Sequence, residues 1–201
     1  MNRRIAVLPD VLANKIAAGE VIQRPESVVK ELVENSLDAG AQRLNIVIQE
    51  GGKKLIQVAD DGMGMDETDA VTSFLRHATS KIASYEDLEE IRTYGFRGEA
   101  LASVAAVAQV TMKTRRADDD VAVVVRIDGG ATPRLDREGR ERGTLISVHN
   151  LFYNVPARRK FLKSDISERR KIGDVIRRYI IARPDVGFKV LIDGKGAYRC
   201  R

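Results

Sequence analysis

Residues 25–40 carry the pattern that most constrains how this chain folds. Pro25 can open a helix and Gly40 can close one. At about 100° per residue, the apolar side chains between them, together with one serine, cover one half of a helical cylinder. The residues on that half are Val28, Val29, Leu32, Val33, Ser36 and Leu37. The pattern predicts an amphipathic helix whose apolar half is buried against the rest of the domain.

A narrow polar stripe runs beside that apolar half. Glu31, Asn35 and Asp38 fall at positions i, i+4 and i+7, so their side chains line up along the helix. A carboxylate, an amide and a second carboxylate at a buried edge can hold a hydrated divalent cation and position a water molecule. The alternative is a solvated helix face on which Lys30 and Glu34 form an ordinary ion pair, and the helix taken alone favours that alternative.

The composition is that of one soluble globular domain, with room for the start of a second. The chain has 201 residues, of which 43% are hydrophobic and 31% charged, so it can bury a substantial core. No apolar run approaches the ~20 residues of a membrane span. Met1–Arg4 precede too short an apolar stretch for a secretory signal, so we expect a cytoplasmic protein. One cysteine and two distant histidines argue against zinc and thiol chemistry.

Basic residues are concentrated near the end of the chain. The formal net charge is +5, and residues 158–183 contain ten lysines and arginines against three acidic residues. Such a cluster is a candidate footprint for a polyanion such as DNA. A solvated helix surface explains the run equally well, because few aromatic residues are interleaved to stack on bases.

A β-hairpin is expected directly after the central helix. Residues 44–49 alternate apolar and polar side chains, and Gly51-Gly52 can make a tight turn into a second strand at 55–60. In that second strand Ile56, Val58 and Asp60 share one face, because side chains alternate along a strand. If the apolar pair faces the helix, Asp60 must project into the space between helix and sheet.

The remaining chain alternates between helical and strand patterns. Helices are predicted over 10–18, from the cap Asp66 to Ala78, and over 84–91, 102–108 and 164–182; strands are predicted over 110–114, 121–127, 145–148 and 188–192, with a last strand after a turn at 193–196. We expect the first helix to stop at Gly19. A capping box between Ser84 and Asp87 opens the helix that runs to about Ile91. Residues 131–142 are polar and irregular, so we expect an exposed loop there.

Two glycine-containing stretches allow a ligand to approach the backbone. Gly62 and Gly64 follow Asp60, and glycine permits φ > 0, although a plain strand-to-helix turn also uses glycine. Gly95 and Gly98 precede a helix whose first N–H groups suit a phosphate chain, although such a loop alone is more often without an anion. The chain has neither a Walker A motif nor a Gly-x-Gly-x-x-Gly dinucleotide fingerprint.

The order and chemistry of these segments resemble the GHKL ATPases, the superfamily of gyrase, Hsp90, histidine kinases and MutL. Residues 30–40, 76–82, 95–101 and 152–161 look like the MutL family of DNA mismatch repair proteins, and the likeness runs from about Ile5 to the end of the chain. The resemblance implies an α+β fold, the GHKL (Bergerat) two-layer sandwich with helices on one face of a mixed, mostly antiparallel sheet. It implies that residues 1–201 form one GHKL-type ATPase domain.

The resemblance also assigns roles to single residues that contact the attacking water, the metal ion and the adenine ring. Glu31 matches the general base that activates the water attacking the γ-phosphate. Asn35 matches the Mg²⁺ ligand, with phosphates and waters completing an octahedron. Asp60 matches the carboxylate that accepts a hydrogen bond from the exocyclic amine of adenine, with Gly62 and Gly64 beside the ring.

Further matched residues lie along the phosphates. Thr79, Ser80 and Lys81 match the loop that meets the phosphates, and Thr144 matches a Gly-Thr motif under the adenine. The backbone amides at the end of the lid cradle the triphosphate; the matching residues are Arg97, Gly98, Glu99, Ala100 and Leu101. A structural role in the lid hinge is preferred for His77. Residues left without a role are Asp38, which capping or solvent contact explains equally well, Tyr153, Asn154 and Arg158–Lys160.

The implied function is an ATP-binding and hydrolysing switch of DNA mismatch repair, with ATP and Mg²⁺ as cofactors. It couples a mismatch recognition protein to a downstream repair endonuclease or helicase, through lid ordering and an ATP-dependent homodimer of the N-terminal region. Contact with DNA is expected to be weak and salt-dependent, with no membrane contact. The lid loops, residues 76–98, are expected to order only on binding. Because a lysine of the family's second domain reaches the γ-phosphate, weak hydrolysis is expected of this chain.

Two other functions compete with this one. A type II topoisomerase ATPase subunit is a GHKL enzyme as well, but residues 152–161 argue against it. A DNA-binding or scaffold module, in which nucleotide is only a structural ligand, belongs to a different class. DNA affinity that depends on salt but ignores ATP and Mg²⁺ would favour the module.

Overall fold

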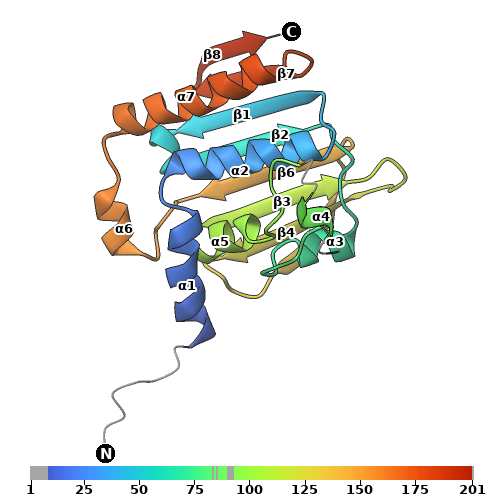
Figure 1. Ribbon diagram of the computed structural model, residues 1–201, viewed down its shortest axis with the longest axis horizontal. Coiled ribbons are helices and arrows are strands. Elements are labelled where there is room, and N and C mark those ends of the chain that lie inside the picture. The colour runs from blue at the N-terminus through green and yellow to red at the C-terminus, as the bar shows by residue number, and fades with distance from the viewer. Residues whose placement is uncertain (1–8, 83, 85, 90–92, 201) are drawn as a thin grey trace, which may run out of the picture.

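One eight-stranded sheet carries the helices on one of its faces (Figure 1). The computed structural model describes residues 9–82, 84, 86–89 and 93–200. The strand order is β5-β4-β3-β6-β2-β1-β7-β8, and every neighbouring pair is antiparallel except β1 and β7. The predicted fold, an α+β sandwich with helices on one face of a mixed, mostly antiparallel sheet, is confirmed.

The elements follow one another in this order: α1 (Asp10–Val21), α2 (Pro25–Asp38), β1 (Arg43–Gln49), η1 (Glu50–Gly52), β2 (Leu55–Asp60), α3 (Glu67–Thr72), α4 (Glu86–Glu89), α5 (Ala100–Val107), β3 (Gln109–Arg115), β4 (Ala122–Asp128), β5 (Arg134–Glu138), β6 (Gly143–His149), α6 (Pro156–Phe161), α7 (Asp165–Ala182), β7 (Gly187–Ile192) and β8 (Lys195–Cys200). Met1–Arg4, Ile5 and Ile91, which the sequence predictions name, lie outside the described residues. The described helices include none with the length and hydrophobicity needed to cross a bilayer.

Helix α2 lies at the centre of the helical layer, as its pattern predicted. Five apolar side chains on its inner half are at most 5% exposed: Val28, Val29, Leu32, Val33 and Leu37. Each contributes about 2 kcal/mol to folding through burial. Pro25 occupies the first helical turn, and Gly40, with φ of 73°, ends the helix beyond the cap residue Ala39.

The hairpin after α2 forms as expected, although its turn is longer than a two-residue one. Strands β1 and β2 are antiparallel, with Ile46 opposite Val58 and Leu44 opposite Asp60. The connection contains the short helix η1, in which Gly51 has φ of 61°. Ile56 and Val58 are buried toward the helices, so Asp60 does project into the space between helix and sheet.

Helix α1 continues two residues past Gly19, so the predicted stop is wrong. A Cβ built on Gly19 would lie 1.2 Å from the Arg158 guanidinium of α6, and that guanidinium donates a hydrogen bond to the Ile16 carbonyl. The glycine therefore makes room for a side chain that packs across the helix, instead of ending it. The Arg24-Pro25 step ends the helical run a few residues later.

The predicted loop at 131–142 contains the edge strand β5. It pairs with β4 from Ala122 opposite Glu138 to Arg126 opposite Arg134. Side chains on both faces of β5 are largely exposed, so the sequence lacks the apolar alternation that marks a half-buried strand. Backbone hydrogen bonds to β4 and an ion pair between Arg126 and Asp136 hold it.

Other predicted boundaries shift by a few residues. Helix α3 is capped by Asp66, whose side chain accepts from the Asp69 amide, but it ends at Thr72 instead of near Ala78, and Leu75 is 58% exposed. The capping box is confirmed, because Ser84 and Asp87 exchange side-chain to backbone hydrogen bonds of 3.0 and 3.4 Å. Helix α6, within the 152–161 stretch, is an element that periodicity did not indicate.

Candidate functional site

Asp60 lies at the end of β2, where three donors converge on its carboxylate. The Ser36 hydroxyl of α2 donates to Oδ2 at 2.8 Å, and the backbone amides of Gly62 and Thr144 donate to Oδ1 at 3.0 and 3.1 Å. Burial raises the pKa of Asp60, and these three hydrogen bonds offset part of that rise. The carboxylate is therefore held in one orientation between α2, β2 and β6.

The glycines after Asp60 are required by space as well as by backbone angle. A Cβ on Gly62 would lie 2.9 Å from the Ala39 carbonyl oxygen, and one on Gly64, with φ of 71°, would lie 2.1 Å from the Arg115 carbonyl oxygen. Asp61 turns away, accepting hydrogen bonds from Gln42 and Arg43. The turn at 61–65 is thus clamped between the ends of α2 and β3.

A pair of threonines extends this cluster under the turn. The Thr144 and Thr114 hydroxyls are 3.0 Å apart, and Thr114 Oγ1 also accepts from the Met65 amide at 2.9 Å. Thr144 was predicted at the site, but Ser36 and Thr114 were missed. The available signal for Ser36 was a small polar residue on the buried half of α2; Thr114 offered none beyond its place in a strand.

The polar stripe of α2 is partly buried and is bonded to Lys81, Tyr94 and Gly95. Lys81 Nζ lies 2.9 Å from Asn35 Oδ1 and 2.5 Å from Asp38 Oδ2. The Asp38 carboxylate also accepts from the backbone amides of Tyr94 at 3.1 Å and Gly95 at 3.4 Å. Its side chain is 7% exposed, so Asp38 is a buried anchor and not a solvent-facing residue.

Glu31 belongs to a second network on the same helix. Lys30 Nζ is 3.3 Å from Glu31 Oε1 and 2.7 Å from Glu34 Oε2. Glu34, only 6% exposed, accepts from the Tyr179 hydroxyl of α7 at 2.5 Å. Burial lowers the pKa of Lys30, but Glu34 and Glu31 raise it by more. The ion pair of Lys30 and Glu34 exists. Its carboxylate is buried against α7, whereas the Lys30 side chain is 47% exposed.

Tyr179 links this network to the segment that follows α4. Burial and the hydrogen bond to Glu34 raise the Tyr179 pKa well above its usual value. Its ring meets that of Tyr94 edge-on, with 6.0 Å between the ring centroids. The pairing of Tyr179 with Glu34 could not be read from the sequence, because the two residues are 145 positions apart.

Residues 76–82 and 95–101 lie against each other. Gly98 has φ of 62°, and a Cβ there would lie 2.4 Å from the Ala78 carbonyl oxygen. Glu99 accepts from Arg76 at 3.1 Å and approaches His77 at 3.5 Å. Helix α5 begins at Ala100, so the amides of its first turn, including that of Leu101, face the start of the helix.

The remaining predicted phosphate residues are less tightly placed. Thr79 Oγ1 accepts from the Lys81 amide at 3.2 Å, and Ser80 is exposed. The Arg97 guanidinium is exposed and lies 5.9 Å from the Phe96 ring centroid. His77 has φ of 63° and a side chain that is 75% exposed. The described contacts do not bring these residues onto α2, as they do Lys81.

Tyr153 and Asn154 have packing partners. The Tyr153 hydroxyl donates to Asp128 at the end of β4, and that hydrogen bond raises the pKa of Tyr153 to about 12. Asn154 Nδ2 donates to the Ala106 carbonyl oxygen of α5 at 3.0 Å. Both residues hold the turn after β6 against its neighbours.

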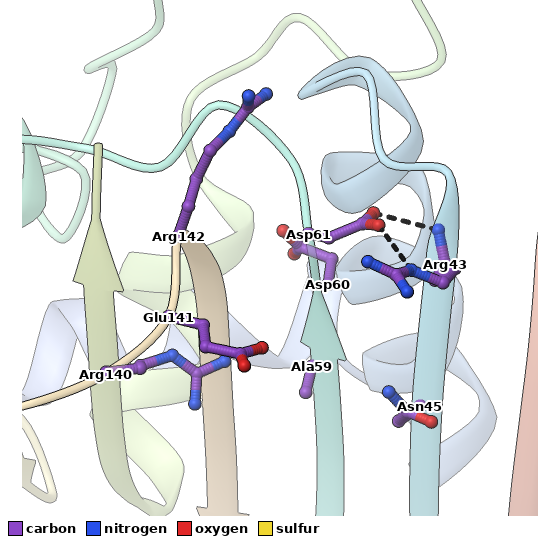
Figure 2. A pocket seen from close by; sticks show the side chains of 8 residues that line it. All are labelled: Arg43, Asn45, Ala59, Asp60, Asp61, Arg140, Glu141 and Arg142. Atoms are coloured by element: carbon purple, nitrogen blue, oxygen red, sulfur yellow. Dashed lines mark hydrogen bonds and ion pairs between the residues drawn. The ribbon is translucent and has the colours of Figure 1, made fainter. Parts of the chain in front are cut away.

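A polar pocket of about 440 Å³ opens on the other side of the sheet (Figure 2). Asn45 and Ala59 are opposite each other in the β1–β2 pair and line it, whereas their neighbours Ile46 and Val58 are buried toward the helices. Arg43 is tied to Asp61 within it. Asp60 also lines the pocket. The pocket therefore lies on the face of the sheet away from Glu31 and Asn35, but it meets the predicted nucleotide site at Asp60.

Asn35 and Asp60 fit the chemistry of a magnesium nucleotide. A cation, the Lys81 ammonium, already contacts Asn35 Oδ1, so this oxygen is oriented as a cation ligand would be. The partly buried Asp60 carboxylate is an oriented acceptor beside glycine backbone, which suits the amine edge of adenine.

Comparison with known proteins gives the family that the sequence motifs resemble. Residues 22–133 match the family described as "Histidine kinase-, DNA gyrase B-, and HSP90-like ATPase". The DNA mismatch repair proteins MutL of Christiangramia forsetii and Porphyromonas gingivalis are 51% and 52% identical to the chain, over 99% and 97% of it. These alignments cover 32% of each relative, so the chain spans about a third of the length of the curated relatives it matches.

Solved structures agree with the sequence comparison. The Aquifex aeolicus MutL ATPase domain complexed with ADP matches with a TM-score of 0.73 and 32% identity, over 90% of this chain and 65% of that one. The N-terminal domain of a DNA repair protein matches with a TM-score of 0.77 and 29% identity, over 92% of this chain and 54% of that one. Since the family match covers more than half of the chain and the fold agrees, the chain belongs to the histidine kinase-, DNA gyrase B- and HSP90-like ATPase family.

Proposed function

We propose that this chain binds ATP with Mg²⁺ between α2 and the turn after β2, and that it is the ATPase region of a mismatch repair switch. The observation that carries the proposal is the oriented, partly buried Asp60 carboxylate, with Ser36, Gly62 and Thr144 around it. The similarity to MutL proteins supports the repair context.

The base end of the site rests on Asp60. Its carboxylate accepts from the exocyclic amine of adenine, a donor that guanine lacks at that position. Gly62 and Gly64 present no side chain to the ring. Glycine is required at both positions, because a Cβ at either would strike backbone. Thr144 and Thr114 support the turn from below.

The phosphate end rests on α2 and on the two loop segments packed beside α5. Asn35 would hold Mg²⁺, which would supply charge neutralisation at the phosphates. Thr79, Ser80 and Lys81 approach the phosphates from one side. The amides of residues 97–101 approach them from the other, at the positive end of α5.

Glu31 is the general base of the hydrolysis. It orients a water molecule and accepts its proton as the water oxygen bonds to the γ-phosphorus; the bond from that phosphorus to the β–γ bridging oxygen breaks, giving ADP and inorganic phosphate. The Lys30 ammonium lies 3.3 Å from Glu31 Oε1 and restrains the position of the carboxylate.

The functions of the whole repair protein belong to a chain of the relatives' length. We propose that full turnover, ATP-dependent homodimerisation and coupling of a mismatch recognition protein to a downstream endonuclease or helicase need residues beyond the third that this chain spans. Contact with DNA through α6 and α7 is proposed as weak and salt-dependent.

Thermal unfolding with and without a non-hydrolysable ATP analogue and Mg²⁺ tests the site. At a ligand concentration 100 times Kd, binding stabilises the native state by about 2.7 kcal/mol, which raises Tm by about 5–10 °C in a domain of this size. Asp60→Ala should remove this increase. Asp61→Ala is the matched control, since Asp61 faces Arg43 on the other side, and should keep it. The proposal fails if the chain shows no increase or if Asp60→Ala retains it.

A further inference from the structure

The Lys81 ammonium occupies a position between two side chains of the α2 stripe. Its Nζ lies 2.9 Å from Asn35 Oδ1 and 2.5 Å from Asp38 Oδ2. The Lys81 and Asp38 side chains are only 18% and 7% exposed, so solvent screens this ion pair poorly. The contact is therefore stronger than an exposed lysine pair would be.

Asn35 Oδ1 is also the oxygen assigned to magnesium in the proposed function. Mg²⁺ binds oxygen at about 2.0–2.1 Å. Two cations on this one oxygen, with Lys81 at 2.9 Å, would be separated by no more than about 5 Å and would repel each other strongly in a partly buried site. Magnesium and the Lys81 ammonium are therefore competitors for Asn35.

Asp38 holds the competing lysine and the loop beyond it at the same time. Its carboxylate accepts from the amides of Tyr94 and Gly95 as well as from Lys81. Gly95 lies directly over the lysine, because a Cβ there would be 3.6 Å from Lys81 Nζ. One carboxylate thus fastens two segments, around residues 81 and 95, to α2.

We propose that Lys81, held by its counter-ion Asp38, covers Asn35 in the nucleotide-free chain, and that a magnesium nucleotide must displace it. This rests on the proposed function. Asp38 is then a positioning residue that acts through Lys81. Lys81 is two residues from Thr79, so its displaced ammonium is free to turn to the phosphates. Metal binding and release of Lys81 from α2 therefore occur together.

Calorimetric titration with ADP, once in MgCl₂ and once in EDTA, tests this inference. The readout is the magnesium enhancement, the ratio of the Kd in EDTA to the Kd in MgCl₂. Asp38→Asn keeps an oxygen for the loop amides but removes the charge that holds Lys81. Lys81→Gln removes the competing cation itself. Because the covered state lowers the apparent affinity for magnesium nucleotide, both variants should raise the enhancement, by about fivefold.

Lys54→Gln is the matched control. Lys54 also pairs with a carboxylate, that of Glu50, but at the far end of the hairpin. The magnesium enhancement of Lys54→Gln should therefore equal that of the unsubstituted chain. An unchanged or smaller enhancement in Lys81→Gln overturns the inference. A smaller magnesium enhancement in Asp38→Asn also overturns the inference, since it would show that Asp38 is part of the metal site. If Asp38→Asn does not fold, the magnesium enhancement of Lys81→Gln alone tests the inference. Absence of ADP binding by the unsubstituted chain overturns the proposed function together with the inference.

Discussion

Glu31 is the single residue on which turnover is expected to depend. In a protein of the relatives' length, Glu31→Ala should reduce ATP hydrolysis by about 10²–10⁴-fold, because the attacking water loses its general base. Nucleotide affinity should be unchanged. Glu26→Ala, on the first turn of α2 and paired with Lys171, is the control and should leave turnover intact. Normal hydrolysis by Glu31→Ala would show that the base lies elsewhere.

Asp60 should make nucleotide binding sensitive to acid. Burial raises its pKa, so protonation begins at a higher pH than for an ordinary aspartate, and the protonated oxygen no longer accepts from adenine. Affinity for ADP should therefore fall as the pH is lowered through this raised value. The free protein responds in the opposite sense: a raised pKa in the folded state means that protonating Asp60 favours folding. Titrations across pH check this, and Asp60→Asn should show weaker, pH-independent binding.

Gly40 and Gly64 form a matched pair for separating backbone strain from lack of space. Their φ angles are 73° and 71°, but a Cβ on Gly40 meets nothing within 4 Å, whereas one on Gly64 meets the Arg115 carbonyl oxygen at 2.1 Å. Gly40→Ala should cost about 1 kcal/mol of unfolding free energy, from backbone strain alone. Gly64→Ala should cost about 1–3 kcal/mol more. Urea unfolding measures the loss of unfolding free energy in each variant. Equal losses would show that the turn at 61–65 is not tightly packed against β3.

At the scale of elements, a buried ion pair joins the start of α7 to the start of α2. Glu168 is fully buried and accepts from Arg24 and from the Lys163 amide, each at 2.8 Å. Glu168→Ala leaves the partly buried Arg24 without its partner and should cost roughly 3 kcal/mol. Asp174→Ala removes an exposed ion pair with Arg177 on the same helix and should change stability by less than about 1 kcal/mol. Similar effects of the two would mean that Glu168 does not join the helices.

At the scale of the whole molecule, the basic segment is less positive than its sequence indicates. Several of its cations are already neutralised, for example Arg169 by Asp193 and Lys171 by Glu26. Within the described chain, six basic side chains of residues 158–183 have no ion pair. One of them, Arg158, packs on α1 and donates to the Ile16 carbonyl oxygen. The other five are Arg159, Lys160, Lys163, Arg170 and Arg178. Contact with DNA is therefore expected to use few charges.

The salt dependence of duplex DNA binding tests that expectation. Five phosphate contacts give a slope of log K against log salt no steeper than about −4.5. The double variant R159A/K160A should make the slope shallower by about 2. A steeper slope in the unsubstituted chain would mean that ion-paired cations or other surfaces contact DNA.

Local patterns predicted most of the elements and the segments that carry the site. The apolar half of α2, the cap at Asp66 and the box of Ser84 and Asp87 depend on residues three to seven positions apart, so neighbours in sequence determine them. The same reasoning failed where the determinant is not local. β5 is a strand because β4 pairs with it, and α1 passes Gly19 because Arg158 packs there.

By itself the sequence determined which side chains share a helix or strand face, including the Glu31, Asn35 and Asp38 stripe and the inward position of Asp60. It also contained the motifs that resemble MutL. Only the tertiary structure decided the partners: Ser36 for Asp60, 24 residues away, Lys81 for Asn35, 46 residues away, and Tyr179 for Glu34, 145 residues away. The physical reason is that periodicity specifies the direction of a side chain along its own element, whereas its partner depends on how distant elements pack together.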